Sequence, residues 1–217
     1  MILLLFDMDG TLVDSAALLL AAQEEACRLH GHLHPGRQAG LDVVGLTLDL
    51  ALGRLIGTNK PEAEMGETYK RLFNTMRSDA TNPEFGEPLY PGVAEGLARL
   101  HDREDVILGI ATGKTRRGYD YLADRHDWAR YFVTVQTSDV APSKPHPGMI
   151  KQAMRETGIG PERTFMIGDS NHDMEMAVAA GVTGVGVSWG FQPVEVLRKS
   201  GAKYIVERFD EIEALIA

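Results

Sequence analysis

The sequence has a single cysteine and fewer basic than acidic residues. Cys27 has no partner for an internal disulfide, which favours a reducing compartment. The first apolar run, residues 2–6, is far too short to cross a membrane, and the acids that follow it argue against a signal peptide. The 22 basic and 31 acidic residues give a net charge of −9, which repels nucleic acids and anionic membranes as bulk partners. We therefore predict a cytoplasmic protein that must attract any anionic ligand locally.

Short apolar runs alternate with helical patterns over most of the chain. With 217 residues, of which 44% are hydrophobic, the chain can bury a full core. We predict buried parallel strands over residues 2–6, 106–111, 132–135, 164–167 and 182–187. Helices are predicted over residues 93–100, 117–125, 147–157 and 173–180. This alternation predicts an α/β protein with a Rossmann-like, doubly wound parallel sheet.

Residues 15–85 have a different pattern, with helical periodicity and no convincing strand. Amphipathic helices are predicted over residues 16–31, 48–57 and 64–80. A helical insert therefore interrupts the α/β part directly after its first strand. The prolines and glycines of residues 83–92 are typical of the linker that returns to the sheet.

Two carboxylates, Asp7 and Asp9, directly follow the first predicted strand. Asp7 therefore lies at the carboxyl end of a strand, where open α/β sheets bind their ligands. An acid in an Asp-x-Asp-Gly string can also simply cap a turn. The string alone does not decide between these two interpretations.

Polar residues also follow other predicted strands or lie in loops that lead into helices. These residues are Thr112, Gly113, Lys144, Asp169 and Asp173. Because the carboxyl ends of parallel strands share one edge of a sheet, we expect four separate segments to converge there.

The converging residues have the chemistry of a phosphoryl-transfer site. Asp7 and Asp169, with the backbone carbonyl of Asp9, offer hard oxygen ligands suited to Mg²⁺. A cation also lets crowded carboxylates stay ionised. The Thr112 hydroxyl and the Lys144 ammonium are suited to phosphoryl oxygens. One aspartate can attack phosphorus while the other handles protons.

The strings DMDGT and GDSNHD, together with Thr112 and with Lys144 and Pro145, resemble the four motifs of the haloacid dehalogenase-like (HAD) hydrolases. The resemblance spans the chain, since the insert lies where the phosphoglycolate phosphatase-like branch carries a helical cap. It implies a catalytic core of residues 1–14 and 86–217 and a cap of residues 15–85, with hinges near residues 13–16 and 84–90. It also implies a Mg²⁺-dependent phosphatase that hydrolyses a small phosphorylated metabolite through an aspartyl-phosphate.

The resemblance gives each residue a role. Asp7 would be the nucleophile, and Asp9 the general acid and then the general base. Asp7, Asp9 and Asp169 would hold Mg²⁺, while Asp173 would orient the water shell of the metal. The residues expected to bind phosphate are Thr112, Gly113 and Lys144. True dehalogenases resemble this scaffold but lack the second acid, so Asp9 favours phosphoryl transfer.

The second motif departs from the pattern of phosphoglycolate phosphatases, which commonly have Thr-Asn-Lys where this chain has Thr112, Gly113 and Lys114. The departure leaves the substrate open. A phosphosugar mutase of the β-phosphoglucomutase type, an inorganic pyrophosphatase and a non-catalytic metabolite-binding module are the alternatives. The expected partner is a small molecule, with no nucleic acid and no membrane, and the chain is expected to be a monomer or a homodimer.

Four histidines could suggest further sites. His30, His32 and His34 alternate at the end of a predicted helix, beside glycine and proline and without an acid cluster, so we predict a solvated turn. We expect His172, which lies between Asp169 and Asp173, to be a solvent-facing loop residue.

Overall fold

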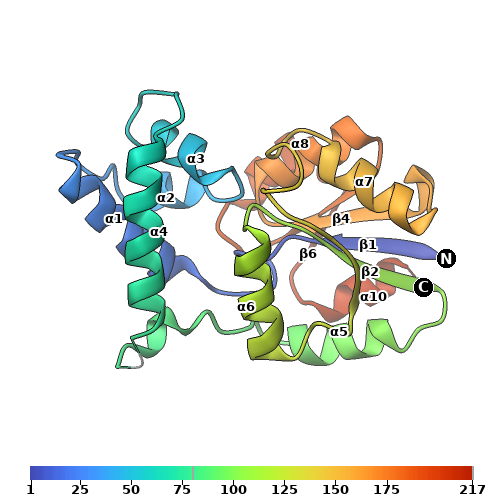
Figure 1. Cartoon of the computed structure of the whole chain (residues 1–217). Coiled ribbons are helices and arrows are strands. Elements are labelled where there is room, and N and C mark those ends of the chain that lie inside the picture. The colour runs from blue at the N-terminus through green and yellow to red at the C-terminus, as the bar shows by residue number, and fades with distance from the viewer. Residues whose placement is uncertain (80, 217) are drawn as a thin grey trace.

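A computed structural model describes residues 1–79 and 81–216 and contains a six-stranded parallel sheet (Figure 1). The strands are β1 (Ile2–Phe6), β2 (Val106–Ala111), β3 (Phe132–Gln136), β4 (Thr164–Gly168), β5 (Thr183–Val187) and β6 (Tyr204–Val206). Their order is β3-β2-β1-β4-β5-β6, which confirms the predicted fold class. Five strands lie at or within one residue of their predicted bounds. β6 was not predicted, because a run of three residues is too short to show a hydrophobic period.

The pairing of β1 brings three strand ends to one edge of the sheet. Phe6, the last residue of β1, pairs with Ile110 of β2 and with Ile167 of β4. The backbone N–H of Asp7 then donates to the carbonyl of Ile167 at 2.9 Å. The polar residues that follow β1, β2 and β4 therefore leave the sheet side by side.

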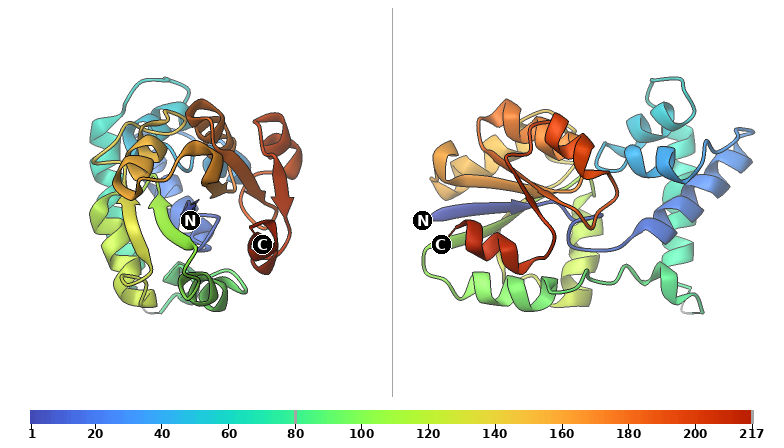
Figure 2. Two further views of the ribbon diagram at one scale, coloured as in Figure 1. Left: turned by 90° about the vertical axis from the view of Figure 1, so that its right-hand side faces the viewer. Right: turned by 180° about the vertical axis from the view of Figure 1, so that it is seen from behind.

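Helices cover both faces of the sheet (Figure 2). Alternate residues of β1 point to opposite faces: Leu4 and Phe6 belong to one apolar cluster, and Leu3 and Leu5 to another. The first cluster includes α5 (Val93–His101), α6 (Arg116–His126) and α10 (Asp210–Leu215), and the second includes α7 (Gly148–Thr157) and α8 (Asn171–Ala180). A further helix, α9 (Val194–Lys199), contacts β5 and α8. The four predicted helices of this region are all present.

The insert consists of helices that pack around an apolar cluster of their own. They are α1 (Ala16–Leu29), α2 (Arg37–Asp42), α3 (Leu48–Leu55) and α4 (Ala63–Arg77), followed by the 3₁₀ helix η1 (Pro83–Gly86). The cluster includes Leu19, Leu52, Tyr69 and Cys27, whose thiol is free and buried. The short α2 was not predicted, and the predicted end of the third insert helix includes residue 80, which lies outside the described residues. None of the helices that the structure describes has the length and apolar character of a membrane span.

The insert lies beyond the carboxyl edge of the sheet, on the left in Figure 1. The two segments that connect it to the sheet run side by side, since Val13 forms an isolated bridge with Leu89. Two backbone hydrogen bonds, Asp14 N–H to Pro88 O at 2.8 Å and Tyr90 N–H to Leu12 O at 3.1 Å, hold them together.

Candidate active site

Asp7 leads into a tight turn that reaches the residue after β4. Gly10 in this turn has a φ of +79°, and a Cβ on it would lie 2.1 Å from Oδ2 of Asp169. Only glycine allows both the backbone conformation and this approach. The Thr11 hydroxyl then donates to Oδ1 of Asp169 at 3.0 Å, and the N–H of Phe191 donates to Oδ2 at 2.8 Å. The DMDGT turn and Asp169 thus position one another.

Three buried aspartates, Asp7, Asp169 and Asp173, each place a carboxylate oxygen within 4.8 Å of the others. The ammonium of Lys144 lies 2.9 Å from Oδ1 of Asp7 and 2.6 Å from Oδ1 of Asp173. Lys144 is 1% exposed, so water cannot replace this ion pairing. One buried ammonium therefore contacts two of the three buried carboxylates.

Burial makes this charge balance unfavourable. Desolvation raises the pKa of Asp7 to about 7; Lys144 opposes the shift and Asp173 adds to it. Desolvation also raises the pKa of Asp169 well above its ordinary value, and the neighbouring Asp173 and Asp7 raise it further. Burial disfavours the Lys144 ammonium, but Asp173 and Asp7 more than offset this, so its pKa is raised. The site therefore contains more negative than positive charge.

The donor set fits a hard divalent cation such as Mg²⁺. All the converging ligands are carboxylate oxygens, which Mg²⁺ prefers. Oδ1 of Asp7 is buried and accepts no well-aligned hydrogen bond from the protein, although the Lys144 ammonium lies nearby. A buried oxygen without a donor is suited to a metal ion or to a substrate.

Asp173 owes its place to the start of α8. Its carboxylate accepts from the N–H of Ser170 at 3.1 Å, and the hydroxyl of Ser170 accepts from the N–H of Asp173, which forms a capping box. The cap starts α8 at Asn171, two residues before the predicted start. The role expected for Asp173, to orient the water shell of the metal, stays a prediction; its carboxylate lies within 4.8 Å of those of Asp7 and Asp169.

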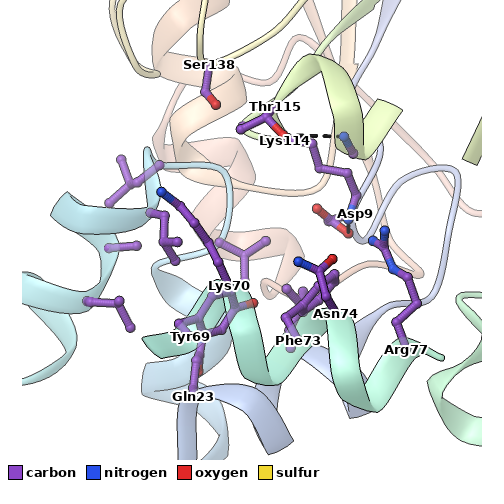
Figure 3. Close-up of a pocket in the computed structure, with 18 of the residues that line it drawn as sticks. Asp9, Gln23, Tyr69, Lys70, Phe73, Asn74, Arg77, Lys114, Thr115 and Ser138 are labelled. Atoms are coloured by element: carbon purple, nitrogen blue, oxygen red, sulfur yellow. Dashed lines mark hydrogen bonds and ion pairs between the residues drawn. The ribbon is translucent and has the colours of Figure 1, made fainter. Parts of the chain in front are cut away.

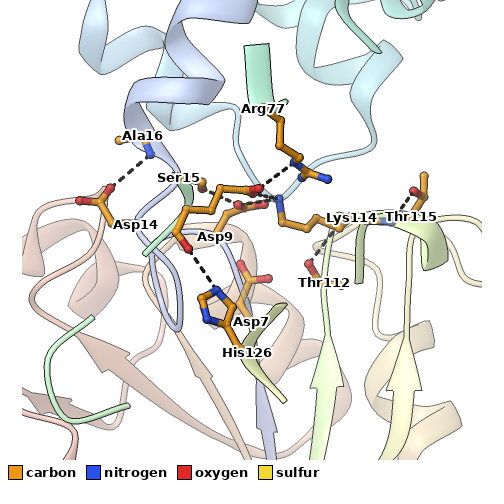
Figure 4. A network of polar contacts seen from close by, with 12 residues as sticks. Asp7, Asp9, Asp14, Ser15, Ala16, Arg77, Thr112, Lys114, Thr115 and His126 are labelled. Carbon is orange, nitrogen blue, oxygen red and sulfur yellow. Dashed lines mark hydrogen bonds and ion pairs between the residues drawn. The ribbon is translucent and has the colours of Figure 1, made fainter. Parts of the chain in front are cut away.

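The carboxylate of Asp9 does not join the cluster. It accepts from the hydroxyl of Ser15 and pairs with the ammonium of Lys114 at 2.9 Å (Figure 4). Asp9 is thereby held in the wall of a cavity between the sheet and the insert. The metal contact expected from its backbone carbonyl stays a prediction.

Thr112 and Gly113 lie at the end of β2, as predicted. The buried Thr112 hydroxyl accepts from the N–H of Lys114 at 3.1 Å. A Cβ on Gly113 would lie 2.8 Å from the carbonyl oxygen of Gly45, which belongs to the insert. An asparagine at this position would require the Gly45 backbone of the insert to move away from the end of β2.

Sequence reasoning missed a chain of buried charges that begins at Asp9. Lys114 also pairs with Glu87 at 3.0 Å, and Glu87 pairs with Arg77 at 2.8 Å. The guanidinium of Arg77 lies 4.5 Å from the ring centroid of Phe73 and 4.2 Å from that of Tyr121. Glu87 is 0% exposed. The chain of charges connects the end of α4 to the loop after β2.

The prediction for His172 is wrong. Its side chain is 4% exposed, lies within α8 and contacts the carbonyl of Asp42 through Nε2 at 3.2 Å. The reason is the early start of α8, which turns this position toward the insert. Burial lowers its pKa.

The three histidines of the insert have separate surroundings. His32 is exposed, whereas His30 contacts the Thr68 hydroxyl at 2.9 Å and His34 contacts Gln23 at 3.2 Å. Within the described part of the chain, the only group of His, Cys, Asp or Glu side chains close enough to share a metal is the aspartate cluster.

A cavity of about 740 Å³ adjoins the site (Figure 3). Asp9, Gly113 and Lys114 line it from the sheet side. Helices α1, α3 and α4 line it from the insert side, through residues that include Leu19, Leu52 and Phe73. The candidate site therefore opens into a space large enough for a small molecule.

Comparison with known proteins identifies the class. A family model described as haloacid dehalogenase-like hydrolase matches residues 4–187, and the chain belongs to this family. It is 33% identical over 211 residues to the protein named "Probable phosphatase IndB" of Dickeya dadantii, covering 97% of this chain and 91% of that protein. It is 31% identical over 214 residues to a phosphoglycolate phosphatase of Photorhabdus laumondii, covering 97% and 90%.

The fold agrees with this assignment. A haloacid dehalogenase-like hydrolase of Streptococcus pneumoniae superposes with a TM-score of 0.83 at 23% identity, covering 100% of this chain and 99% of the other. The family and the names of its relatives confirm the prediction of an enzyme, a hydrolase of the HAD phosphatase kind.

Proposed function

We propose that the protein is a Mg²⁺-dependent phosphatase that hydrolyses a small-molecule phosphomonoester through an aspartyl-phosphate on Asp7. The observation that carries the proposal is the cluster of three buried carboxylates around one ammonium at the end of β1. Such a cluster needs added positive charge, and it is suited to a metal ion together with a phosphoryl group. Bound Mg²⁺ would supply charge neutralisation for the carboxylates and the phosphoryl oxygens.

Asp7 and Asp9 divide the chemistry. A carboxylate oxygen of Asp7 forms a bond to phosphorus while the ester P–O bond breaks, and Asp9 gives a proton to the departing oxygen. Asp9 then takes a proton from water, whose oxygen attacks phosphorus, releases inorganic phosphate and restores Asp7. The separation in the structure supports this division, because Asp7 is held in the buried cluster and Asp9 in the cavity wall.

Thr112, Gly113 and Lys144 would bind the phosphoryl oxygens. The Lys144 ammonium is already 2.9 Å from Asp7, so it would lie beside a phosphoryl group attached there. Thr112 and Gly113 follow the neighbouring strand, β2. In this structure the Thr112 hydroxyl accepts a hydrogen bond from the N–H of Lys114. These donors would offset the charge that develops on oxygen in the transition state.

The helical insert, residues 15–85, would act as a cap over residues 1–14 and 86–217. An aspartyl-phosphate must be shielded from stray water and then exposed to one directed water. A separate apolar core in the insert and two adjacent connecting segments near residues 13–16 and 84–90 support this division. Movement about these connections would admit the substrate.

The experiment that tests the function is release of phosphate from a panel of phosphoesters, with Mg²⁺ and in excess EDTA. The panel contains phosphoglycolate, sugar phosphates, nucleotides and inorganic pyrophosphate. We expect release from at least one monoester only with Mg²⁺, and none after Asp7→Asn, while Asp124→Asn on the exposed side of α6 serves as a matched control.

Other outcomes point elsewhere. Conversion of a sugar phosphate to its isomer without net phosphate release would identify a mutase, and release from pyrophosphate alone would identify a pyrophosphatase. Full activity in EDTA would contradict the metal, and no turnover of any compound would favour a binding module.

A further inference from the structure

The cavity beside Asp9 is larger than a two-carbon phosphoester needs. Its volume is about 740 Å³. A two-carbon acid such as glycolate occupies the space of roughly three to five water molecules, at about 30 Å³ each. Cavities of roughly 300–1,000 Å³ hold ligands the size of a drug molecule. A substrate that fills this cavity therefore has a much larger organic part.

The cavity exists while the insert touches the rest of the protein. The Gly45 carbonyl packs directly against Gly113, and the N–H of Thr47 donates to the hydroxyl of Ser143 at 2.8 Å. The ion pair from Arg77 on α4 adds a further contact across the two parts. The cavity volume is therefore measured with the insert in contact with the rest of the protein.

The insert lines its side of the cavity mainly with apolar side chains. They are Leu19, Val43, Leu48, Leu52, Tyr69 and Phe73. An apolar ring held among them removes apolar surface from water and can contact the Phe73 ring. A small, fully polar organic group would leave these apolar side chains without a partner.

The lining also carries a surplus of positive charge. Five basic residues (Lys70, Arg71, Arg77, Lys114 and Arg117) line the cavity, against Asp9 and Glu67 in the lining and the adjacent Glu87, which pairs with Lys114 and Arg77. Among the residues that the structure describes, Arg71 and Arg117 form no ion pair. In a chain of net charge −9, this surplus attracts an anionic ester in preference to a neutral compound.

We propose that the cavity is the leaving-group site and that the substrate is a phosphomonoester of an alcohol with a large, apolar, ring-bearing organic part. This proposal rests on the proposed function. Asp9 lies in the cavity wall, so the ester oxygen that it protonates is the atom from which the organic part extends into the cavity. The ring then lies against α1, α3 and α4.

The test compares two esters of primary alcohols, ethyl phosphate and naphthylethyl phosphate, whose leaving groups have similar acidity. Phosphate release is measured on the unmodified protein with Mg²⁺. Burial of the naphthyl ring predicts a kcat/KM about 100-fold higher for the larger ester, after allowance for the cost of ordering it. Equal or lower kcat/KM for the larger ester overturns the proposal.

A matched pair of variants locates the effect in the cavity. Leu48→Trp fills part of it, and we expect the ratio of the two kcat/KM values to fall at least about tenfold. Leu33→Trp makes the same exchange at a residue that is 92% exposed and outside the cavity, and it leaves the ratio unchanged. An unchanged ratio in Leu48→Trp also overturns the proposal.

Failure of the function and failure of the cavity assignment are distinguishable. If neither ester releases phosphate, the proposed function fails for this class, and calorimetry with naphthylethanol, the product alcohol, decides the remaining question. Binding that Leu48→Trp abolishes keeps the cavity as a site for ring-bearing molecules. Absence of binding to the unmodified protein rejects it.

Discussion

Replacement of Asp7 by asparagine should stabilise the metal-free protein, and more strongly at alkaline than at acid pH. Asp7 is 2% exposed, and burial raises its pKa from the ordinary value of 3.8 to about 7. The asparagine side chain has nearly the same shape but never ionises. Lys144 keeps Asp173 at 2.6 Å, so the substitution leaves no unpaired buried ammonium.

The size of the effect follows from the pKa shift. Below pH 3.8 the carboxyl group is protonated in both the folded and the unfolded chain, so ionisation of Asp7 costs no stability. Between pH 3.8 and about 7 the unfolded chain loses the proton while the folded chain keeps it, and stability falls as the pH rises. Above pH 7 the loss is constant, at about 4 kcal/mol for a shift of about three pH units.

The assay is urea unfolding in EDTA, followed by circular dichroism at pH 5 and pH 8.5. We expect Asp7→Asn to raise the free energy of unfolding above that of the unmodified protein, and this gain in stability to be about 2–3 kcal/mol larger at pH 8.5 than at pH 5. Asp124→Asn on the exposed side of α6 should show no such difference. An equal or smaller gain at pH 8.5 would refute the claim that the site holds excess negative charge.

Two further predictions concern charge in the same region. Mg²⁺ at about a hundred times its dissociation constant should raise the free energy of unfolding by about 3 kcal/mol, measured by thermal melting. Asp169→Asn should remove most of this gain. An equal gain in the variant and the unmodified protein would exclude Asp169 as a ligand. Glu87→Gln leaves the buried cations Lys114 and Arg77 undercompensated and should cost about 3 kcal/mol in urea unfolding. Glu25→Gln, in an exposed ion pair, should cost much less. Similar losses in the two glutamine variants would show that Glu87 is not a structural counter-ion.

The sheet and its edge were predictable because their signals are local. Buried parallel strands appear as short apolar runs, and a residue that follows such a run must leave the sheet at its carboxyl edge. This argument brings Asp7, Thr112 and Asp169 together without knowledge of any side-chain contact. The sequence pattern did not reveal β6 and α2, because elements of three and six residues are too short to show a period.

The charge chain could not be predicted for a different reason. Glu87 lies in a Pro- and Gly-rich linker, where a glutamate is normally solvated, and Arg77 lies at the end of an amphipathic helix. Only the folding of the linker against the loop after β2 buries Glu87 between two cations. Contacts between three distant segments leave no mark on the local pattern of any one of them.

His172 and Asp173 show how one helix boundary changes a site. The pattern predicts a helix that starts at 173, whereas the Ser170 cap starts α8 at Asn171. The two extra residues bury His172 against the insert and hold Asp173 among the acids. A serine followed three residues later by an acid was the available signal.

The most direct test of the central claim is detection of a phosphoryl group on Asp7. Asp9→Asn removes the base for the water step, and an activated aryl phosphate, whose leaving group departs without a proton, can still phosphorylate Asp7 in this variant. The phosphoenzyme should therefore accumulate when the variant is mixed with Mg²⁺ and an aryl phosphate that the unmodified protein hydrolyses, and is then quenched in acid. Mass spectrometry should show one added phosphoryl group on the peptide that contains Asp7, and none in EDTA. A phosphoryl group on another residue, or turnover without any labelled protein, would contradict Asp7 as the nucleophile.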